Sequence, residues 1–486
     1  MSEEILINIT PPETRVALIE NGIVQEIMIE RSARRGLVGN IYKGKICRVL
    51  PGMQAAFVEI GLDRAAFLHA SDISYTTRAE NRQPDNITNL VREGGEIIVQ
   101  VVKDPLGTKG ARLTTNLSIP SRYLVFMPSL RSAGISQKIE NQDERARLRK
   151  TIDEYIKESD YQGGFIARTA AEGVSETTLQ SDMRFLFRLW RDIEERHQST
   201  SSPKVIHEDL PLLLRALRDL ITPEVEKIRI DSRVSSEKAR QFADKVMPDL
   251  EVEIECYTGA RPLFDMYNVE DEIEKALQRK VDLKSGGHLV IDQTEAMTTI
   301  DVNTGAFVGH RNLEETIYKT NMEAAQAIGR QLRLRNLGGI IIIDFIDMTN
   351  DEHKRQVIRA LEKCLARDHA KTQITEVSSL GLVEMTRKRT RESLEHVLCQ
   401  TCACCNGRGS QKTTETTCYE IFREILREAR QFDVESLLVL ASQEVIDRLL
   451  DEESANLAEL EAFIGKTIRL QAELLYTQEQ YDIVLI

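Results

Sequence analysis

The sequence lacks any long hydrophobic segment. None of its apolar runs approaches the roughly 18 residues that a membrane-spanning helix needs. The first residues, MSEEILINIT, are acidic and lack the basic stretch and apolar core of a secretory signal peptide. Low-complexity segments and internal repeats are also missing. These absences argue against a membrane or secreted protein, and we expect a cytoplasmic protein with no membrane partner.

Cysteine is scarce over most of the chain. Only eight of the 486 residues are cysteines, and a cytoplasmic protein keeps its thiols reduced. This pattern excludes a disulfide framework. Five of the eight nevertheless lie within twenty residues of one another: Cys399, Cys402, Cys404, Cys405 and Cys418.

The chain also lacks an overall positive charge, since its formal net charge is −13. A uniformly basic nucleic-acid-binding surface is therefore excluded. The basic residues do cluster, however. A nucleic acid would have to bind to basic stripes formed by these clusters. The alternative is that each cluster belongs to a solvated helix face without a ligand. The clusters are Arg330, Arg333 and Arg335, and Arg387, Lys388, Arg389 and Arg391.

The order of predicted elements indicates a multidomain α/β protein. Residues 4–30 contain three strand-like segments, and residues 38–118 contain five short strands with glycine-marked turns, typical of an oligonucleotide-binding (OB) barrel. Residues 120–215 mix charged helices with a short strand, and residues 223–279 contain two more strands near helices. Residues 286–398 alternate strands and helices, and a helical segment follows residue 411.

Carboxylates appear at the end of two predicted strands. In MTTIDVN the side chains of Asp301 and Asn303 share one face, because side chains alternate along a strand. The run IIIID predicts a strand buried on both faces that ends at Asp344, which would lie beside Asp301 if the strands are neighbours. Two converging carboxylates are suited to Mg²⁺. Helix capping is the alternative, although residues 349–352 match a capping box of their own.

Two phenylalanines are predicted on the outer face of the barrel. The alternation in MQAAFVEIG and RAAFLHA points Phe57 and Phe67 outward, where they could stack with unpaired bases. Lys109 and Arg112 in the last strand could neutralise phosphates. The alternative is that the phenylalanines pack against a neighbouring domain.

The segment CQTCACCNGRG contains a metal-binding spacing. Cys402 and Cys405 form a CxxC motif followed by glycines, which suits two thiolates on one Zn²⁺. A structural zinc needs four ligands. Either further local residues (Cys399, Cys404, Cys418 or His396) complete the site, or a second chain contributes its own pair; free thiols in a turn are the remaining alternative.

The order of these motifs resembles the ribonuclease E/G endoribonucleases over nearly the whole chain. The segments that carry the resemblance are NIYKGKI, AAFVEIG, FIARTA, TIDVNTG, RQLRLRNLGGIIIIDFIDM and the Cys402–Cys405 motif. The sequence stops shortly after the small C-terminal domain and lacks a long disordered extension, so we expect it to resemble most the shorter, ribonuclease G-like branch of the family.

The resemblance implies a particular division of the chain. An RNase H-like subdomain (residues 1–36 and 216–279) is split by an inserted S1 barrel of the OB fold (37–119) and a 5′-sensor region (120–215). A DNase I-like α/β catalytic subdomain (280–398), a zinc-link (399–410) and a small C-terminal α/β domain (411–486) follow.

The resemblance also implies a function. We expect a Mg²⁺-dependent endoribonuclease that cleaves single-stranded, AU-rich RNA to 5′-phosphate and 3′-hydroxyl ends. A 5′-monophosphate should stimulate it, and its substrates should belong to rRNA maturation and mRNA decay. A homodimer linked by a shared zinc, with a dimer of dimers as a further possibility, is also implied. The alternatives are a non-catalytic S1-type RNA-binding scaffold with a structural zinc, and a nuclease that acts on DNA.

Roles for individual residues follow from the resemblance. Asp301 and Asp344 match the magnesium-binding catalytic acids, and Asn303 matches the residue that orients the first acid. Three positions match the RNA-binding surface of the S1 domain: Phe57, Phe67 and Lys109. Three match the pocket for a 5′-monophosphate: Arg168, Thr169 and Val125. Cys402 and Cys405 match the zinc ligands, but Ala403 stands where the family usually has proline, and Cys399 and Cys404 are additional thiols.

Overall fold

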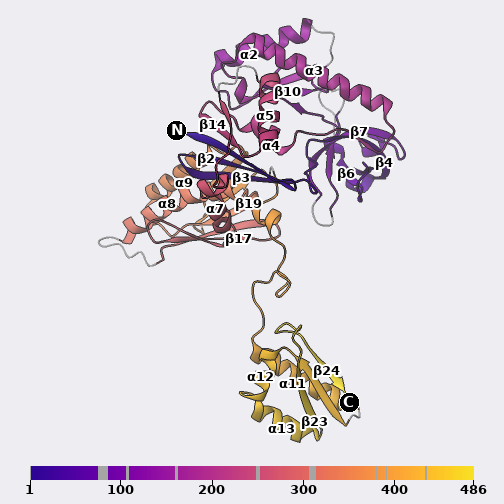
Figure 1. Cartoon of the computed structure of the whole chain (residues 1–486), viewed down its shortest axis with the longest axis vertical. Helices are drawn as coiled ribbons and strands as arrows, with labels where there is room; N and C mark the ends of the chain where they lie inside the picture. The colour runs from indigo at the N-terminus through magenta and orange to yellow at the C-terminus, as the bar shows by residue number, and fades with distance from the viewer. Residues whose placement is uncertain are drawn as a thin grey trace. The chain divides into compact units, whose positions relative to one another are not determined.

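The computed structural model describes residues 2–74, 86–105, 109–158, 163–247, 252–305, 313–378, 380–389, 391–432 and 435–486. Its chain separates into two compact units, residues 1–397 and 398–486. Among the described residues, no helix is both long and apolar enough to cross a membrane. Figure 1 shows the elements of each unit.

A five-stranded sheet joins the N-terminus to a much later segment. Its order is β15-β14-β1-β2-β3, and β1 pairs with β14 in parallel. Residues before 32 and after 224 therefore share one sheet, with the barrel and its neighbour inserted between them. The strands are β1 (Glu3–Ile9), β2 (Glu13–Glu20), β3 (Ile23–Arg31), β14 (Val225–Ile230) and β15 (Glu253–Cys256); the helices nearby in sequence are α4 (Leu212–Leu220), α5 (Arg233–Val246), α6 (Leu263–Met266) and α7 (Val269–Ala276).

The predicted five-stranded barrel is present. Strands β4, β5, β6, β8 and β7 follow one another, and pairing of β4 with β7 closes the ring, while β13 extends it from outside. Small and branched side chains fill the interior, among them Ala56, Val58 and Leu68. The elements are β4 (Ile41–Leu50), β5 (Ala55–Glu59), β6 (Ala66–His69), α1 (Ile87–Leu90), β7 (Glu96–Lys103), β8 (Arg112–Thr114) and β13 (Lys204–His207).

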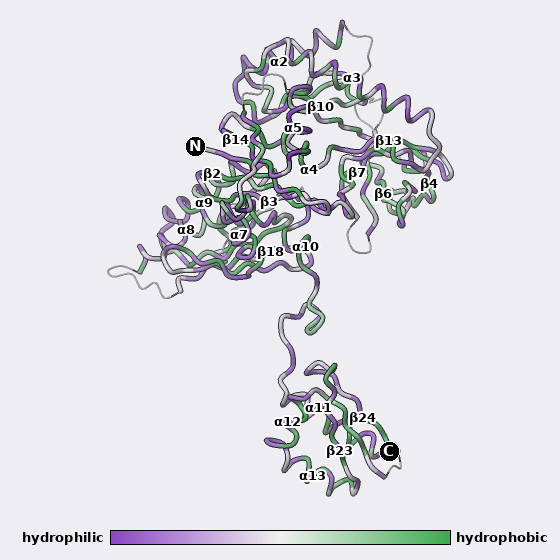
Figure 2. The backbone as a smooth tube through the Cα atoms, viewed as in Figure 1, coloured by the Kyte–Doolittle hydropathy of each residue, from purple (hydrophilic) through white to green (hydrophobic). Residues whose placement is uncertain are grey.

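Next to the barrel in sequence, a small sheet packs against two long helices. Phe126, Phe165 and Phe187 form the centre of this core, with ring centroids 5.0–5.3 Å apart. Many residues along these helices are hydrophilic, as Figure 2 shows. The elements are β9 (Ile119–Pro120), β10 (Leu124–Met127), β11 (Gly134–Ile135), β12 (Gly164–Ala167), α2 (Gln142–Glu158) and α3 (Glu176–Ser199).

A six-stranded mixed sheet carries the predicted acids. Its order is β16-β17-β18-β19-β21-β20, and one face packs against α8 and α9 through Ile300, Ile341 and Ile343. At the start of α8, Leu313 is 75% exposed, whereas Thr316 and Thr320 are buried. The elements are β16 (Lys280–Asp282), β17 (His288–Gln293), β18 (Met297–Asn303), α8 (Leu313–Leu334), β19 (Gly339–Asp344), α9 (Asp351–Leu365), β20 (Thr372–Val377), β21 (Leu382–Arg387) and α10 (Leu394–Leu398).

The C-terminal unit is a three-stranded sheet with helices. Its order is β23-β22-β24, and Cys418 is buried in its core beside Ile421 and Val445. Cys418 therefore serves as a core residue of this unit. The elements are α11 (Thr414–Gln431), β22 (Ser436–Ala441), α12 (Gln443–Leu450), α13 (Ser454–Ile464), β23 (Thr467–Ala472) and β24 (Tyr481–Leu485).

Candidate active site and RNA-contacting surfaces

Asp301 and Asp344 lie side by side on the open face of the six-stranded sheet. Strands β18 and β19 are parallel neighbours, and Asp301 is in register with Asp344. Both carboxylates are exposed, whereas Ile300 and Ile343 on the opposite face are buried against the helices. The structure confirms the prediction that Asp344 lies beside Asp301.

The prediction that β19 is buried on both faces is wrong. Ile341 and Ile343 are fully buried, but Ile340 is 48% exposed. Only one face is covered by α8 and α9, so burial alternates along the strand. This alternation places Asp344 on the solvent-facing side, together with Asp301.

An amide fixes the orientation of one carboxylate. The Asn303 side chain donates a hydrogen bond to Oδ2 of Asp301 at 2.8 Å. Partial burial raises the pKa of Asp344, and the negative charges of Asp301 and Asp347 raise it further. Asp301 and Asp347 therefore both repel the charge of Asp344, and a divalent cation would relieve that repulsion.

The loop after β19 is held by a residue that the sequence analysis missed. Asn321 of α8 is fully buried; its amide donates to the Ile346 carbonyl oxygen at 2.7 Å and accepts from the Ile346 N–H at 3.1 Å. This clamp fixes the backbone beside Asp347. The only signal in the sequence is an asparagine at a buried position of an amphipathic helix.

Helix α9 has its own N-cap, as predicted. Asn350 accepts from the Glu352 N–H at 2.8 Å. The Thr349 hydroxyl contacts Glu314 instead, so the cap is Asn350 and not the first residue of the predicted box. Neither Asp344 nor Asp347 caps this helix.

The outer face of the barrel carries a row of cationic and aromatic residues across four strands. Phe57 is in register with Phe67, and their rings meet edge to face at 6.1 Å and 69°. Arg48 stands beside Phe57, and Arg112 beside Phe67. Both phenylalanines are half-buried, so they are not core residues. The sequence pattern does not indicate Arg48, because a bulge in β4 shifts the register between Ile46 and Arg48.

Of the two cations predicted in the last barrel strand, Arg112 begins β8, but Lys109 lies before that strand, which corrects the prediction for Lys109. Arg112 donates from Nε and Nη2 to Asp72 at 3.0 and 2.8 Å, which fixes its guanidinium. Lys109 is exposed. A Cβ on the following residue, Gly110, would lie 2.3 Å from the Ala65 carbonyl oxygen, so the segment that carries Lys109 runs directly against the start of β6.

Arg168 follows β12 and lies beside the start of β10. Its N–H donates to the Tyr123 carbonyl oxygen, and Val125 pairs with Ile166 two residues earlier, so Val125 and Arg168 stand on the same face. Thr169 is exposed at the first turn after the strand. The structure thus brings Arg168, Thr169 and Val125 together.

Asp219 and Asp182 hold Arg168 and the neighbouring Ser121 in place through hydrogen bonds. The Arg168 guanidinium donates to the Ser121 carbonyl oxygen at 2.6 Å and to Asp219 at 2.7 Å. Burial tends to raise the pKa of Asp219, but hydrogen bonds from Arg218 and the charge of Arg168 lower it overall. Asp182 on α3 accepts from the Ser121 hydroxyl, and burial raises the pKa of Asp182 to about 6.

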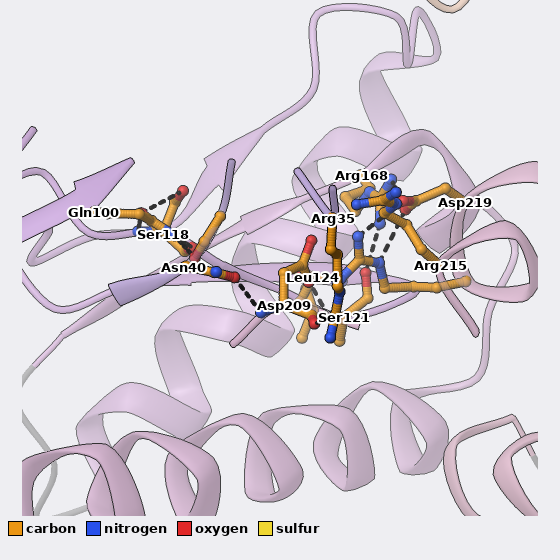
Figure 3. A network of polar contacts seen from close by, with 12 residues as sticks. Arg35, Asn40, Gln100, Ser118, Ser121, Leu124, Arg168, Asp209, Arg215 and Asp219 are labelled. Atoms are coloured by element: carbon orange, nitrogen blue, oxygen red, sulfur yellow. Dashed lines mark hydrogen bonds and ion pairs between the residues drawn. The ribbon is translucent and has the colours of Figure 1, made fainter. Parts of the chain in front are cut away.

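Polar contacts continue from Arg168 to the barrel. Arg218 links Asp219 to Asp209, and the Asp209 N–H donates to Asn40 at 2.9 Å. Gln100 of β7 then holds the Ser118 backbone at both its N–H and its carbonyl oxygen. Figure 3 shows this line of contacts from Gln100 to Arg168.

Three arginines of the two basic clusters are buried and cannot contact RNA, which corrects the prediction for them, whereas Lys388, Arg389 and Arg391 are exposed. Arg333 is buried between Glu20 at 2.8 Å and Glu26 at 3.1 Å. Arg387 is buried against Asp368 at 2.6 and 3.0 Å, and Arg335 is buried against Gln331. Arg333 therefore joins α8 to β2 and β3, and Arg387 joins β21 to the segment after α9.

The cysteine motif forms a tight turn. The backbone N–H groups of Gly409 and Gly407 hydrogen-bond to the Cys405 sulfur and lower its pKa; Cys402 also hydrogen-bonds to it. Cys399, Cys402 and Cys404 are exposed. Within the described residues, no group of three or more His, Cys, Asp or Glu side chains is arranged to hold a metal. The chain therefore brings two thiols together at this turn.

Comparison with known proteins assigns three regions. Residues 37–115 match the S1 RNA binding domain, residues 118–390 the Ribonuclease E/G family, and residues 401–486 the RNase E/G thioredoxin-like domain. The last match agrees with the expected small C-terminal α/β domain and specifies it as thioredoxin-like.

Full-length relatives agree with these matches. The chain is 57% identical over 491 aligned residues to Ribonuclease G of Escherichia coli K12, with 100% of both chains covered. It is 55% identical to Ribonuclease G of Haemophilus influenzae, with 99% of both covered. Ribonuclease E of E. coli K12 is 39% identical and matches 93% of this chain but only 43% of its own length. With its S1 barrel, paired acids and matching domains, the chain belongs to the ribonuclease E/G family.

Proposed function

We propose that Asp301 and Asp344 hold Mg²⁺ and that this endoribonuclease hydrolyses single-stranded RNA beside them. The observation that carries the proposal is the register of Asp301 with Asp344 on an exposed polar sheet face. Asp347 lies close enough to raise the pKa of Asp344. Oxygen ligands and an open, solvent-accessible position are what Mg²⁺ prefers.

Each residue of this site has a distinct part in the proposal. Bound Mg²⁺ would polarise a phosphoryl oxygen and lower the pKa of a coordinated water. Asn303 holds Oδ2 of Asp301, which leaves Oδ1 free to face the metal. Asn321 keeps the loop that carries Asp347 in place. Cleavage in this manner leaves 5′-phosphate and 3′-hydroxyl ends.

The substrate chain is held at two further places in this proposal. Unpaired bases stack on Phe57 and Phe67 while Lys109 and Arg48 meet the phosphates. A 5′-monophosphate binds Arg168 and Thr169, with Val125 beside it, and stimulates cleavage. We further propose AU-rich substrates from rRNA maturation and mRNA decay, in the cytoplasm.

The cysteine motif fits a shared structural zinc. Cys402 and Cys405 supply half of a tetrahedral thiolate shell, and the same pair from a second chain would complete it across a two-fold axis. The hydrogen bonds to the Cys405 sulfur favour its thiolate form. A homodimer follows, with pairing of dimers as a further step.

The test is cleavage and binding by an Asp301→Asn variant. Loss of a metal ligand should slow single-turnover cleavage by about a thousandfold, which corresponds to roughly 4 kcal/mol of transition-state stabilisation. RNA affinity, measured by fluorescence anisotropy, should stay near the wild-type value. Thr299→Ala, which changes an exposed residue on the same strand face, is the control and should cleave normally.

Any of the following results would contradict the proposal. Undiminished cleavage by Asp301→Asn, or by wild type in excess EDTA, would remove the metal mechanism. Tight RNA binding without cleavage by wild type at any Mg²⁺ concentration would favour the RNA-binding scaffold instead. Cleavage of single-stranded DNA at the rate of RNA would favour a DNA nuclease.

A further inference from the structure

A groove lies on the side of the six-stranded sheet opposite to the two acids. It has a volume of about 710 Å³ and is lined by α8, α9 and residues Glu20 and Gln25 of β2 and β3. The helices cover the sheet face of Ile300 and Ile341, whereas Asp301 and Asp344 are on the other face. The groove is therefore separate from the proposed active site, and the proposed nuclease function does not use it.

The groove is strongly basic in an otherwise acidic chain. Five cations line it with a single carboxylate, that of Glu20: Arg330, Arg333, Arg359, Lys363 and Arg367. Two of them are held by acids, since Arg333 binds Glu20 and Glu26 and Arg330 binds Glu272. Arg367 reaches Glu20 only at 3.8 Å.

The outer wall, formed by α9, supplies the available charge. Arg359 and Lys363 are exposed and lie one turn apart on the helix. Neither makes a hydrogen bond or ion pair with any residue that the structure describes. Like charges at this spacing repel each other, so a bound anion would stabilise the wall.

The rest of the lining suits a ligand larger than a simple ion. Tyr318 is held in place because its ring stacks on His353 at 4.3 Å and its hydroxyl donates to Gln356 at 2.5 Å. Gln25 and Gln326 add amide groups that can donate and accept. The volume lies within the range of about 300–1,000 Å³ that small-molecule sites occupy.

The groove is closely built at its base. A Cβ on Gly329 of α8 would lie 2.7 Å from Cβ of Cys364 on α9, so the two helices touch there. Cys364 also lines the groove and is half-buried. A ligand in the groove would therefore cover this thiol.

We propose that this groove binds a small polyphosphate anion of nucleotide size. Arg359, Lys363 and Arg367 meet the phosphates, and the glutamine amides and Tyr318 contact the remainder of the ligand. Because Glu20 and Gln25 come from the first sheet, the ligand also bridges that sheet to the helices of the catalytic sheet.

The experiment measures binding of ATP to the full chain by isothermal titration calorimetry without RNA. The double variant Arg359→Gln/Lys363→Gln should weaken ATP binding at least tenfold. The matched control, Arg149→Gln/Lys150→Gln, removes the same charges from exposed positions of α2 and should leave binding unchanged. Thermal unfolding of both variants checks that they remain folded.

A second measurement locates the ligand. ATP should slow alkylation of Cys364 by iodoacetamide, followed by peptide mass spectrometry, and leave alkylation of the exposed Cys47 unchanged. The proposal is overturned if ATP shows no saturable binding, if the α9 double variant binds ATP like wild type, or if Cys364 is not protected. None of these readouts depends on RNA cleavage, so failure here is distinct from failure of the proposed function.

Discussion

At the scale of single residues, the guanidinium of Arg168 is held in an orientation that suits binding of an anion. Two of its donors are already held by Ser121 and Asp219, which fixes the plane of the guanidinium. The side chain remains 29% exposed, so further donors are accessible to a phosphate. A fixed guanidinium loses little conformational entropy when it binds, which favours recognition of a terminal phosphate.

We predict that Arg168→Ala removes the preference for a 5′-monophosphate. Charge-assisted hydrogen bonds are worth about 1.5–3 kcal/mol, or roughly ten- to a hundredfold in rate or affinity. Wild type should cleave a 5′-monophosphorylated oligonucleotide faster than its 5′-hydroxyl counterpart, and the variant should cleave both at the slower rate. Arg149→Ala on α2 is the control. Equal rates for the two substrates in wild type would refute the role.

Arginines also show where single-residue prediction from sequence fails. Asp301 and Asn303 were assigned to one face correctly, because the period of a strand is local. Arg333 and Arg387 were expected on a basic surface but are buried in ion pairs with Glu20, Glu26 and Asp368. Nothing near Arg333 in the sequence indicates that β2 and β3 will meet α8.

At the scale of elements, periodicity predicted most strands and their outward faces. The barrel strands, β18 and β19 lie where the sequence pattern predicted them. The isoleucine run of β19 predicted a strand buried on both faces, because a continuous apolar run does not reveal that one face is open. Similarly, the bulge in β4 shifts Arg48 into the row of Phe57 and Phe67, which simple alternation could not predict.

We predict that the Phe57→Ala/Phe67→Ala variant binds single-stranded RNA more weakly, by about 1–3 kcal/mol for each stacked base. Anisotropy titrations with a labelled oligonucleotide measure the change. Tyr419→Ala, which removes an exposed aromatic ring from the C-terminal unit, is the control and should bind normally. Unchanged affinity together with a sharp fall in melting temperature would show that the phenylalanines serve stability only.

At the scale of the whole molecule, the chain consists of two units joined at the cysteine motif. Residues 1–397 and 398–486 are compact by themselves, and Cys402 and Cys405 lie at the start of the second unit. Two thiols cannot complete a tetrahedral zinc site alone. The sequence predicted the pair, but a chain considered by itself does not show what supplies the other ligands.

We predict one zinc per two chains, bound by Cys402 and Cys405 of each. Native mass spectrometry with metal counting should show a zinc-containing dimer, and Cys402→Ser should give zinc-free monomers. Cys404→Ser is the control and should leave the dimer intact. One zinc in each chain, or a dimer that persists in Cys402→Ser, would reject the shared site.

The account as a whole depends on a divalent cation between Asp301 and Asp344, and the most direct measurement is metal binding itself. Mn²⁺ replaces Mg²⁺ in oxygen-ligand sites, so electron paramagnetic resonance titrations can count bound ions in wild type, Asp301→Asn and Asp344→Asn. The account predicts one Mn²⁺ site in wild type that Mg²⁺ displaces and that each variant weakens at least tenfold. Equal Mn²⁺ binding in all three proteins would contradict it.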